Sequence, residues 1–135
     1  MRETTGLVYT VSSQFDVKRT RGTYEVQYAC DPSNVAKARA IIVQNLLRMQ
    51  TEPVGDSDLE RARALLLREI PLSESSVDGI AQGFLRRVDL DLPLDEPIRA
   101  ARQYVKLTAD EVRAAFEKWI RPGDLIQVAQ GPEPK

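Results

Sequence analysis

Two stretches near the N-terminus alternate residue by residue, and they constrain the fold more than any other feature of this chain. Residues 7–13 and residues 23–29 are rich in β-branched and aromatic side chains, which favour strands. Successive side chains of a strand point to opposite faces. One face is therefore formed by Leu7, Tyr9, Val11 and Ser13 in the first stretch, and by Tyr24, Val26 and Tyr28 in the second. The polar residues between the two stretches predict an antiparallel hairpin.

A long amphipathic helix is predicted directly after this hairpin. Asp31 is a suitable N-cap and Pro32 a suitable first helical residue, because an aspartate can accept hydrogen bonds from the first turn and proline has a helical φ. The helix is expected to end before Pro53. Its apolar positions recur every three or four residues, at Val35, Ala38, Ile42, Leu46 and Met49.

Further helices are predicted by the same period and by local start and stop signals. Ser57 and Glu60 have the spacing of a capping box, and Pro71 is expected to close the helix that they open. Thr108 and Glu111 form a second such box at the start of the last helix. Between them we expect a helix over residues 76–88 and a short one through Ile98, Ala101 and Val105.

Residues 124–131 are rich in apolar side chains and predict a buried third strand. The order of two strands, several helices and one strand indicates an α+β fold class. We expect a two-layer sandwich, with helices packed on one face of a small antiparallel or mixed sheet. Three strands make a narrow sheet, so we expect it to belong to a wider one.

Composition excludes several classes of function. The 135 residues are expected to form a single domain, residues 1–135. A net charge of −1 gives no field that would attract nucleic acid or an anionic membrane. No segment is long and apolar enough to predict a transmembrane helix. We therefore expect neither a nucleic-acid partner nor a membrane partner.

The residue types needed for most hydrolytic chemistry are missing. The sequence contains no histidine and a single cysteine, Cys30, so it predicts neither an ordinary zinc site nor a serine–histidine–acid triad. Residues 89–97 alternate carboxylates with apolar side chains, but the ligand spacing and central glycine of a calcium loop are absent. We interpret them as a linker between helices. No catalytic residue and no metal ligand is predicted in this chain.

Arg2 and Tyr9 are the candidate binding residues. Gly6 permits a sharp entry into the first strand, so that the guanidinium of Arg2 and the phenol of Tyr9 could be presented together at its start. Such a pair suits carbonyl or carboxylate groups. The alternative is that Arg2 is a mobile terminal charge and Tyr9 an ordinary half-buried strand aromatic.

The pattern Arg-Glu-x-x-Gly-Leu-x-Tyr over residues 2–9 resembles the second, non-catalytic domain of the insulinase, pitrilysin and mitochondrial-processing-peptidase zinc metallopeptidases. The resemblance continues along nearly the whole chain. Its further segments are Asp31-Pro32, Leu59-Glu60-Arg61-Ala62, Leu72-Ser73-Glu74-Ser75-Ser76, Leu107-Thr108-Ala109-Asp110-Glu111-Val112 and the closing residues 128–132.

This resemblance implies a function and partners. In the family, an arginine and a tyrosine at this spacing bind substrate backbone over a zinc site carried by another domain, and Arg2 and Tyr9 match them. It implies that the chain is the back portion of an inactive peptidase-like domain that begins with a further strand and helix. Zinc is then expected in a partner catalytic domain, in cis or in trans, with an extended peptide as substrate. Association into a homo-oligomer is expected through an uncovered sheet edge. The alternative is a purely structural or assembly domain.

Overall fold

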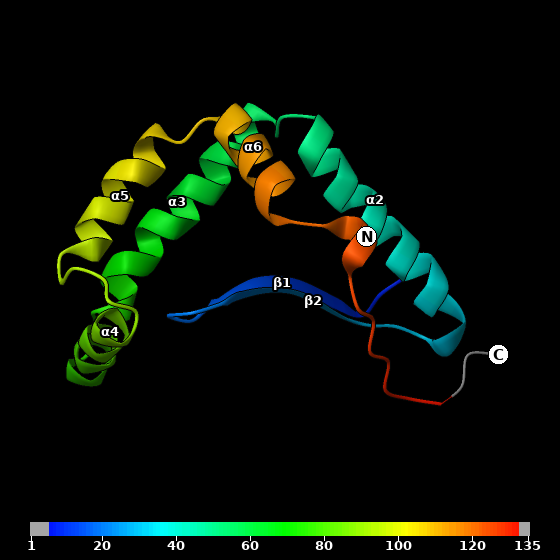
Figure 1. The fold of residues 1–135 in the computed structure, drawn as a ribbon, viewed down its shortest axis with the longest axis horizontal. Helices are drawn as coiled ribbons and strands as arrows, with labels where there is room; N and C mark the ends of the chain where they lie inside the picture. Colours follow the sequence, from blue (N-terminus) through cyan, green and yellow to red (C-terminus); the bar gives the residue numbers. More distant parts are fainter. Residues whose placement is uncertain (1–5, 133–135) are drawn as a thin grey trace. The chain divides into compact units, whose positions relative to one another are not determined.

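A computed structural model describes residues 6–132 (Figure 1). It confirms the predicted α+β class, with helices and a small antiparallel sheet. Two compact units make up the chain. The first contains residues up to Val17, Gly22–Glu52 and residues from Ala114 onward, and the second contains Lys18–Arg21 and Pro53–Arg113.

The predicted hairpin is present in the first unit. Strands β1 (Thr10–Val17) and β2 (Gly22–Ala29) pair antiparallel, with Ser13 opposite Val26 and Phe15 opposite Tyr24. Side chains of β2 alternate between half-buried and exposed positions, as the sequence predicted. Tyr24, Val26 and Tyr28 form the half-buried face and pack against the core.

The first strand begins later than predicted. We expected it from Leu7, but β1 starts at Thr10. Leu7 and Val8, which would lie on opposite faces of a strand, are both buried, in one cluster with Ala38. The chain therefore enters the hairpin through an irregular segment, because burying both neighbouring side chains is incompatible with a regular strand that has one exposed face.

A long helix follows the hairpin. A short 3-10 turn, η1 (Pro32–Asn34), leads from Asp31 into α2 (Val35–Thr51). The buried residues of α2 are Ala38, Ile42 and Leu46, three of the positions predicted from the period.

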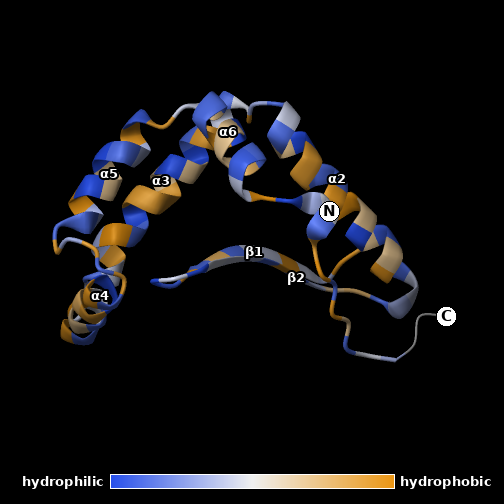
Figure 2. Cartoon of the chain, in the orientation of Figure 1, coloured by the Kyte–Doolittle hydropathy of each residue, from blue (hydrophilic) through white to orange (hydrophobic). Residues whose placement is uncertain are grey.

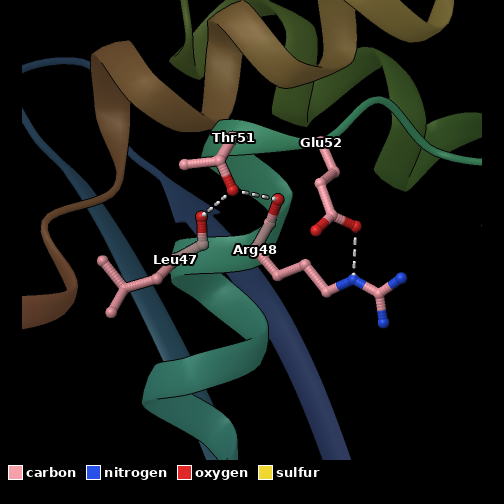
Figure 3. A network of polar contacts seen from close by, with 4 residues as sticks. All are labelled: Leu47, Arg48, Thr51 and Glu52. Carbon is pink, nitrogen blue, oxygen red and sulfur yellow. Dashed lines mark hydrogen bonds and ion pairs between the residues drawn. The ribbon is translucent and has the colours of Figure 1, made fainter.

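The C-terminal turn of α2 makes hydrogen bonds among its own residues (Figure 3). The Thr51 hydroxyl donates to the carbonyls of Leu47 and Arg48 at 3.3 and 3.2 Å. Arg48 Nε donates to Glu52 Oε2 at 2.7 Å, and both of these side chains are exposed. The Arg48 carbonyl also accepts Glu52 N–H at 2.8 Å, which closes the last turn. Helix α2 ends at Thr51, before Pro53, as predicted.

The core of the first unit lies between the hairpin and two helices. Helix α6 (Ala109–Trp119) is followed by the 3-10 turn η2 (Pro122–Asp124). Ile42 and Leu46 of α2 and Ile120 form a buried cluster, against which the half-buried face of β2 packs. This places helices on one face of the hairpin, which is the predicted layer arrangement.

The predicted third strand is absent. Residues 125–131 have no strand assignment, and Ile126 and Val128 are 92% and 90% exposed. Within the described part of the chain, these residues make no backbone hydrogen bond to β2. A strand exists only when a neighbour satisfies its backbone groups, so apolar content alone was insufficient to predict it.

The second unit consists of helices. It contains α3 (Asp56–Ser73), α4 (Val77–Asp89) and α5 (Glu96–Lys106). Helix α3 packs along α5, and Arg63 Nη2 donates to the carbonyl of Leu107. Ser76 is the N-cap of α4, where its hydroxyl accepts from Gly79 N–H at 3.0 Å. The helix over residues 76–88 is thereby confirmed.

The two predicted capping boxes have opposite outcomes. Thr108 and Glu111 bond reciprocally: Thr108 N–H donates to Glu111 Oε2 at 2.7 Å, and Glu111 N–H donates to Thr108 Oγ1 at 3.2 Å. The box at Ser57 is wrong, because the N-cap of α3 is Gly55, whose carbonyl accepts from Asp58 and Leu59 N–H. Acidic side chains in the first turn favour this earlier start through the helix dipole.

Pro71 does not close α3, contrary to our expectation, and the helix runs on to Ser73. The proline ring holds a helical φ and removes only one hydrogen bond near the helix end. The Ser73 hydroxyl donates to the carbonyl of Ile70 at 2.8 Å, and the Ser75 hydroxyl donates to that of Leu72 at 2.7 Å. These side chains satisfy the carbonyls of the last turn.

The second unit exposes much of its apolar surface. The ribbon of α4 carries several hydrophobic segments (Figure 2). The exposed apolar residues of this helix recur at helical spacing, and they are Val77, Ile80, Phe84, Leu85 and Val88. Among the described residues of this unit, Leu59 and Arg87 are the buried side chains. A helix face of this kind is the usual mark of a surface that another element covers.

Candidate functional site

Tyr9 lies directly before β1, at the entrance to the hairpin. Its backbone N–H donates to the carbonyl of Ala29 at 2.7 Å, which extends the pairing of the two strands by one bond. Its phenol donates to Asp31 Oδ1, also at 2.7 Å. The residue is 59% exposed, so the phenol oxygen is accessible to a ligand.

Asp31 has a different role from the one predicted. It stands at the N-cap position of η1 with an extended backbone, φ −62° and ψ 148°, but its side chain makes no capping hydrogen bond. Its carboxylate instead accepts a hydrogen bond from the Tyr9 phenol. The position of the helix start was therefore predicted correctly, whereas the hydrogen-bond partner of the carboxylate was not.

The carboxylate raises the pKa of the Tyr9 phenol above its ordinary value. The main cause is the hydrogen bond to Asp31, followed by the negative charge of Asp31, both of which favour the neutral phenol. Tyr9 is thus a neutral donor at physiological pH. Its proton is directed at Asp31, and the oxygen lone pairs remain free to accept a backbone N–H from a ligand.

Arg2, the other predicted binding residue, lies outside the described residues. Its proximity to Tyr9 therefore stays a prediction. Sequence reasoning missed Asp31 as the partner of Tyr9, because the two residues are 22 positions apart and nothing local connects them.

A cleft borders the edge of β2 that does not face β1. One cavity there, of about 210 Å³, lies between residues of β2 and α2 and residues 125–128. A second, of about 350 Å³, continues along β2 to Cys30 and residues 127–130. Gln127 Nε2 donates to Tyr28 Oη at 3.2 Å across this region. An unpaired strand edge offers backbone donors and acceptors to an extended peptide.

The donor set does not fit a zinc ion. Histidine is absent from the sequence, and Cys30 is the single cysteine. Across residues 6–132, no three or more cysteine and carboxylate side chains come close enough together to hold a metal. Structural and catalytic zinc sites take three or four such ligands.

In the part of the chain that the structure describes, no helix is both long and apolar enough to cross a lipid bilayer.

Comparison with known protein families gives a match to the first part of the chain. The model of a protein family described as the peptidase M16 inactive domain matches residues 1–66. This segment includes Arg2, the hairpin with Tyr9, Asp31 and helix α2. Searches of curated proteins and of solved structures gave no significant match.

Proposed function

We propose, from the premise that residues 1–66 belong to the family of peptidase M16 inactive domains, that this chain helps to enclose and bind an extended peptide. The peptide would lie over a zinc site carried by another domain or subunit of a metalloendopeptidase. The domain itself is non-catalytic, in agreement with the absence of histidine from its sequence. Zinc, the general base and the hydrolysis step belong to the partner in this proposal.

The observation that carries the proposal is the exposed Tyr9 phenol at the start of the hairpin. Asp31 holds the phenol in a defined place at 2.7 Å, so it can meet a peptide backbone without first becoming ordered. Arg2 lies seven positions earlier in the sequence. With Arg2 donating to a carbonyl and Tyr9 contacting the next peptide group, the pair would fix the register of an extended substrate.

Reconstitution tests this proposal. The partner catalytic domain, taken from the same polypeptide or from a protein encoded beside it, is assayed with and without this chain on a quenched extended peptide. We expect chelator-sensitive cleavage that depends on the chain and that falls when Tyr9 is replaced by Phe. Equal cleavage with and without the chain would refute a role in substrate binding.

A purely structural or assembly role is the second candidate. The apolar row along α4, in which Val77 and Leu85 are 82% and 71% exposed, supports it. Such a row is suited to a partner helix face. In the reconstitution, this role predicts that the chain is needed for a stable complex while Tyr9→Phe leaves cleavage unchanged.

A further inference from the structure

Arg87 is the only buried charged residue among residues 6–132. Its side chain starts from α4 in the second unit, and the residue is 8% exposed. Its Nε atom is buried and has no hydrogen-bond partner within the described chain. Burying a guanidinium without a full set of partners costs folding free energy, because the lost hydration of the charge is then not replaced by ion pairs and hydrogen bonds.

Local sequence explains how α4 holds this side chain. Long helical side chains run back toward the N-terminus over the preceding turn, so Arg87 lies over Gly83 and Phe84. A Cβ added at Gly83 would be 3.4 Å from Arg87 Nη1, in ordinary van der Waals contact, which places the guanidinium directly over this residue. The Phe84 ring lies 4.8 Å from Arg87 Cζ, as a cation–π contact.

The carboxylate nearest to this guanidinium leaves it incompletely paired. Glu74 Oε1 is 3.8 Å from Arg87 Nη1, which is ion-pair range but longer than a hydrogen bond. The Glu74 side chain is 42% exposed, so water weakens its attraction. Arg87 thus retains donor capacity for a closer anion.

Arg87 also lines a cavity of about 390 Å³ between α3, α4 and α5. Its apolar wall is formed by Leu66, Ile70, Leu92 and Ala100. The other charged residues of the lining are Arg86, Glu69 and Glu96. Its volume lies within the usual range for small-ligand sites, roughly 300 to 1,000 Å³. A buried cation at an apolar cavity is suited to a ligand with one anionic group and an apolar body.

We propose that this cavity binds a monocarboxylate with an apolar body, whose carboxylate pairs with Arg87. The planar guanidinium can pair with a carboxylate through two parallel hydrogen bonds. Glu69 and Glu96, which also line the cavity, would repel the second charge of a phosphate monoester. The carboxylate belongs either to a free aliphatic acid or to the C-terminus of a peptide. This site is independent of the proposed role of Tyr9.

Binding to the 135-residue chain tests the proposal with two acid probes and their amides. Hexanoate is compared with hexanamide, and acetyl-Leu-Leu with its C-terminal amide, by calorimetry and by the NMR signal of the Arg87 side-chain N–H. At least one acid should saturate, shift this signal, and bind roughly tenfold or more tighter than its amide, as expected for a hydrogen bond to a charged group. The acid that does so identifies the source of the carboxylate. Equal binding of acid and amide, or no saturation by either acid, would overturn the proposal.

Substitutions of arginine provide a second test. Arg87→Gln should abolish the preference for the acid over its amide, whereas Arg61→Gln, at an exposed position of α3 outside the cavity lining, should retain it. Retention of the full preference by Arg87→Gln would contradict the assignment. If Arg87→Gln does not fold, the comparison of acid with amide on the unchanged chain still decides.

Discussion

The phenol of Tyr9 donates a 2.7 Å hydrogen bond to Asp31 Oδ1, across 22 positions of sequence. This bond joins the entrance of the hairpin to the start of the first helix. It takes the Asp31 carboxylate away from the capping role that its position suggested. The same contact sets the protonation state of the phenol and fixes where it is presented.

Titration of Tyr9 is expected to show the influence of Asp31. Because Asp31 raises the phenol pKa, Tyr9 should ionise at higher pH than a free tyrosine, and Asp31→Asn should move its pKa back down. The raised pKa stabilises the folded state below the ordinary phenol pKa, and this contribution is lost as the pH rises through the folded-state pKa. The titration of Tyr9 is measured by tyrosinate absorbance at 295 nm, as the difference between the curve of the unchanged chain and that of Tyr9→Phe. An unchanged Tyr9 titration in Asp31→Asn would show that the bond does not form in solution.

Turnover in the intact or reconstituted peptidase is expected to depend on Arg2 and Tyr9. If Arg2 donates to the substrate carbonyl or its developing oxyanion, Arg2→Ala should lower kcat on the order of a hundredfold. Tyr9 accepts the N–H of the neighbouring peptide group in this arrangement, so Tyr9→Phe should lower kcat/KM by roughly tenfold. Tyr24→Phe is the matched control, because it removes a phenol hydroxyl elsewhere in the hairpin. Thermal melts verify folding. Normal kcat/KM in both folded variants would refute the assignment. A loss of activity that parallels a loss of folding stability would not support it.

Gln50 is expected to contribute to the stability of the first unit. Its Nε2 donates to the carbonyls of Phe116 and Ile120 at 3.1 and 2.7 Å, at the end of α6. Gln50→Ala would remove the side-chain donor from the Ile120 carbonyl, whereas the Phe116 carbonyl would still accept from Ile120 N–H at 3.0 Å. The free energy of unfolding should therefore fall by about 1–3 kcal/mol. Urea denaturation followed by circular dichroism measures it. The control is Gln44→Ala, at an exposed position of α2, which should cost far less.

The isolated chain is expected to retain no stoichiometric zinc and to cleave no peptide, because it lacks the ligands and the general base. Metal analysis after dialysis, together with a casein or quenched-peptide assay, tests both parts. One zinc bound per chain, or cleavage that a chelator abolishes, would contradict this expectation.

Association of the isolated chain is expected to increase with concentration, through strand pairing at the hairpin. All eight residues of β1 are exposed, and an exposed strand edge readily pairs with another chain. Val11→Lys should reduce the mass measured by light scattering, whereas Val77→Lys on the exposed face of α4 should not. A strict monomer at high concentration would refute association. The reverse pattern in the two variants would move the contact to α4.

Features that depend on near neighbours could be predicted from the sequence. Alternation along β2 predicted its half-buried face, because the period of two is a property of every strand. The reciprocal bonds of Thr108 and Glu111 followed from a spacing of three, which brings the two groups together at any helix start. The period of α2 predicted which of its residues are buried.

Tertiary structure decided the features that depend on distant partners. Residues 125–131 have the composition of a strand but no strand assignment, since pairing needs another backbone beside them. Asp31 could have capped the helix locally, yet its carboxylate accepts a hydrogen bond from Tyr9, 22 positions away. The burial of Arg87 needed α3 and α5 around the cavity. The side-chain period of a strand or helix follows from its own backbone geometry. The hydrogen-bond partner of a polar group depends instead on which residues the fold brings within hydrogen-bond distance.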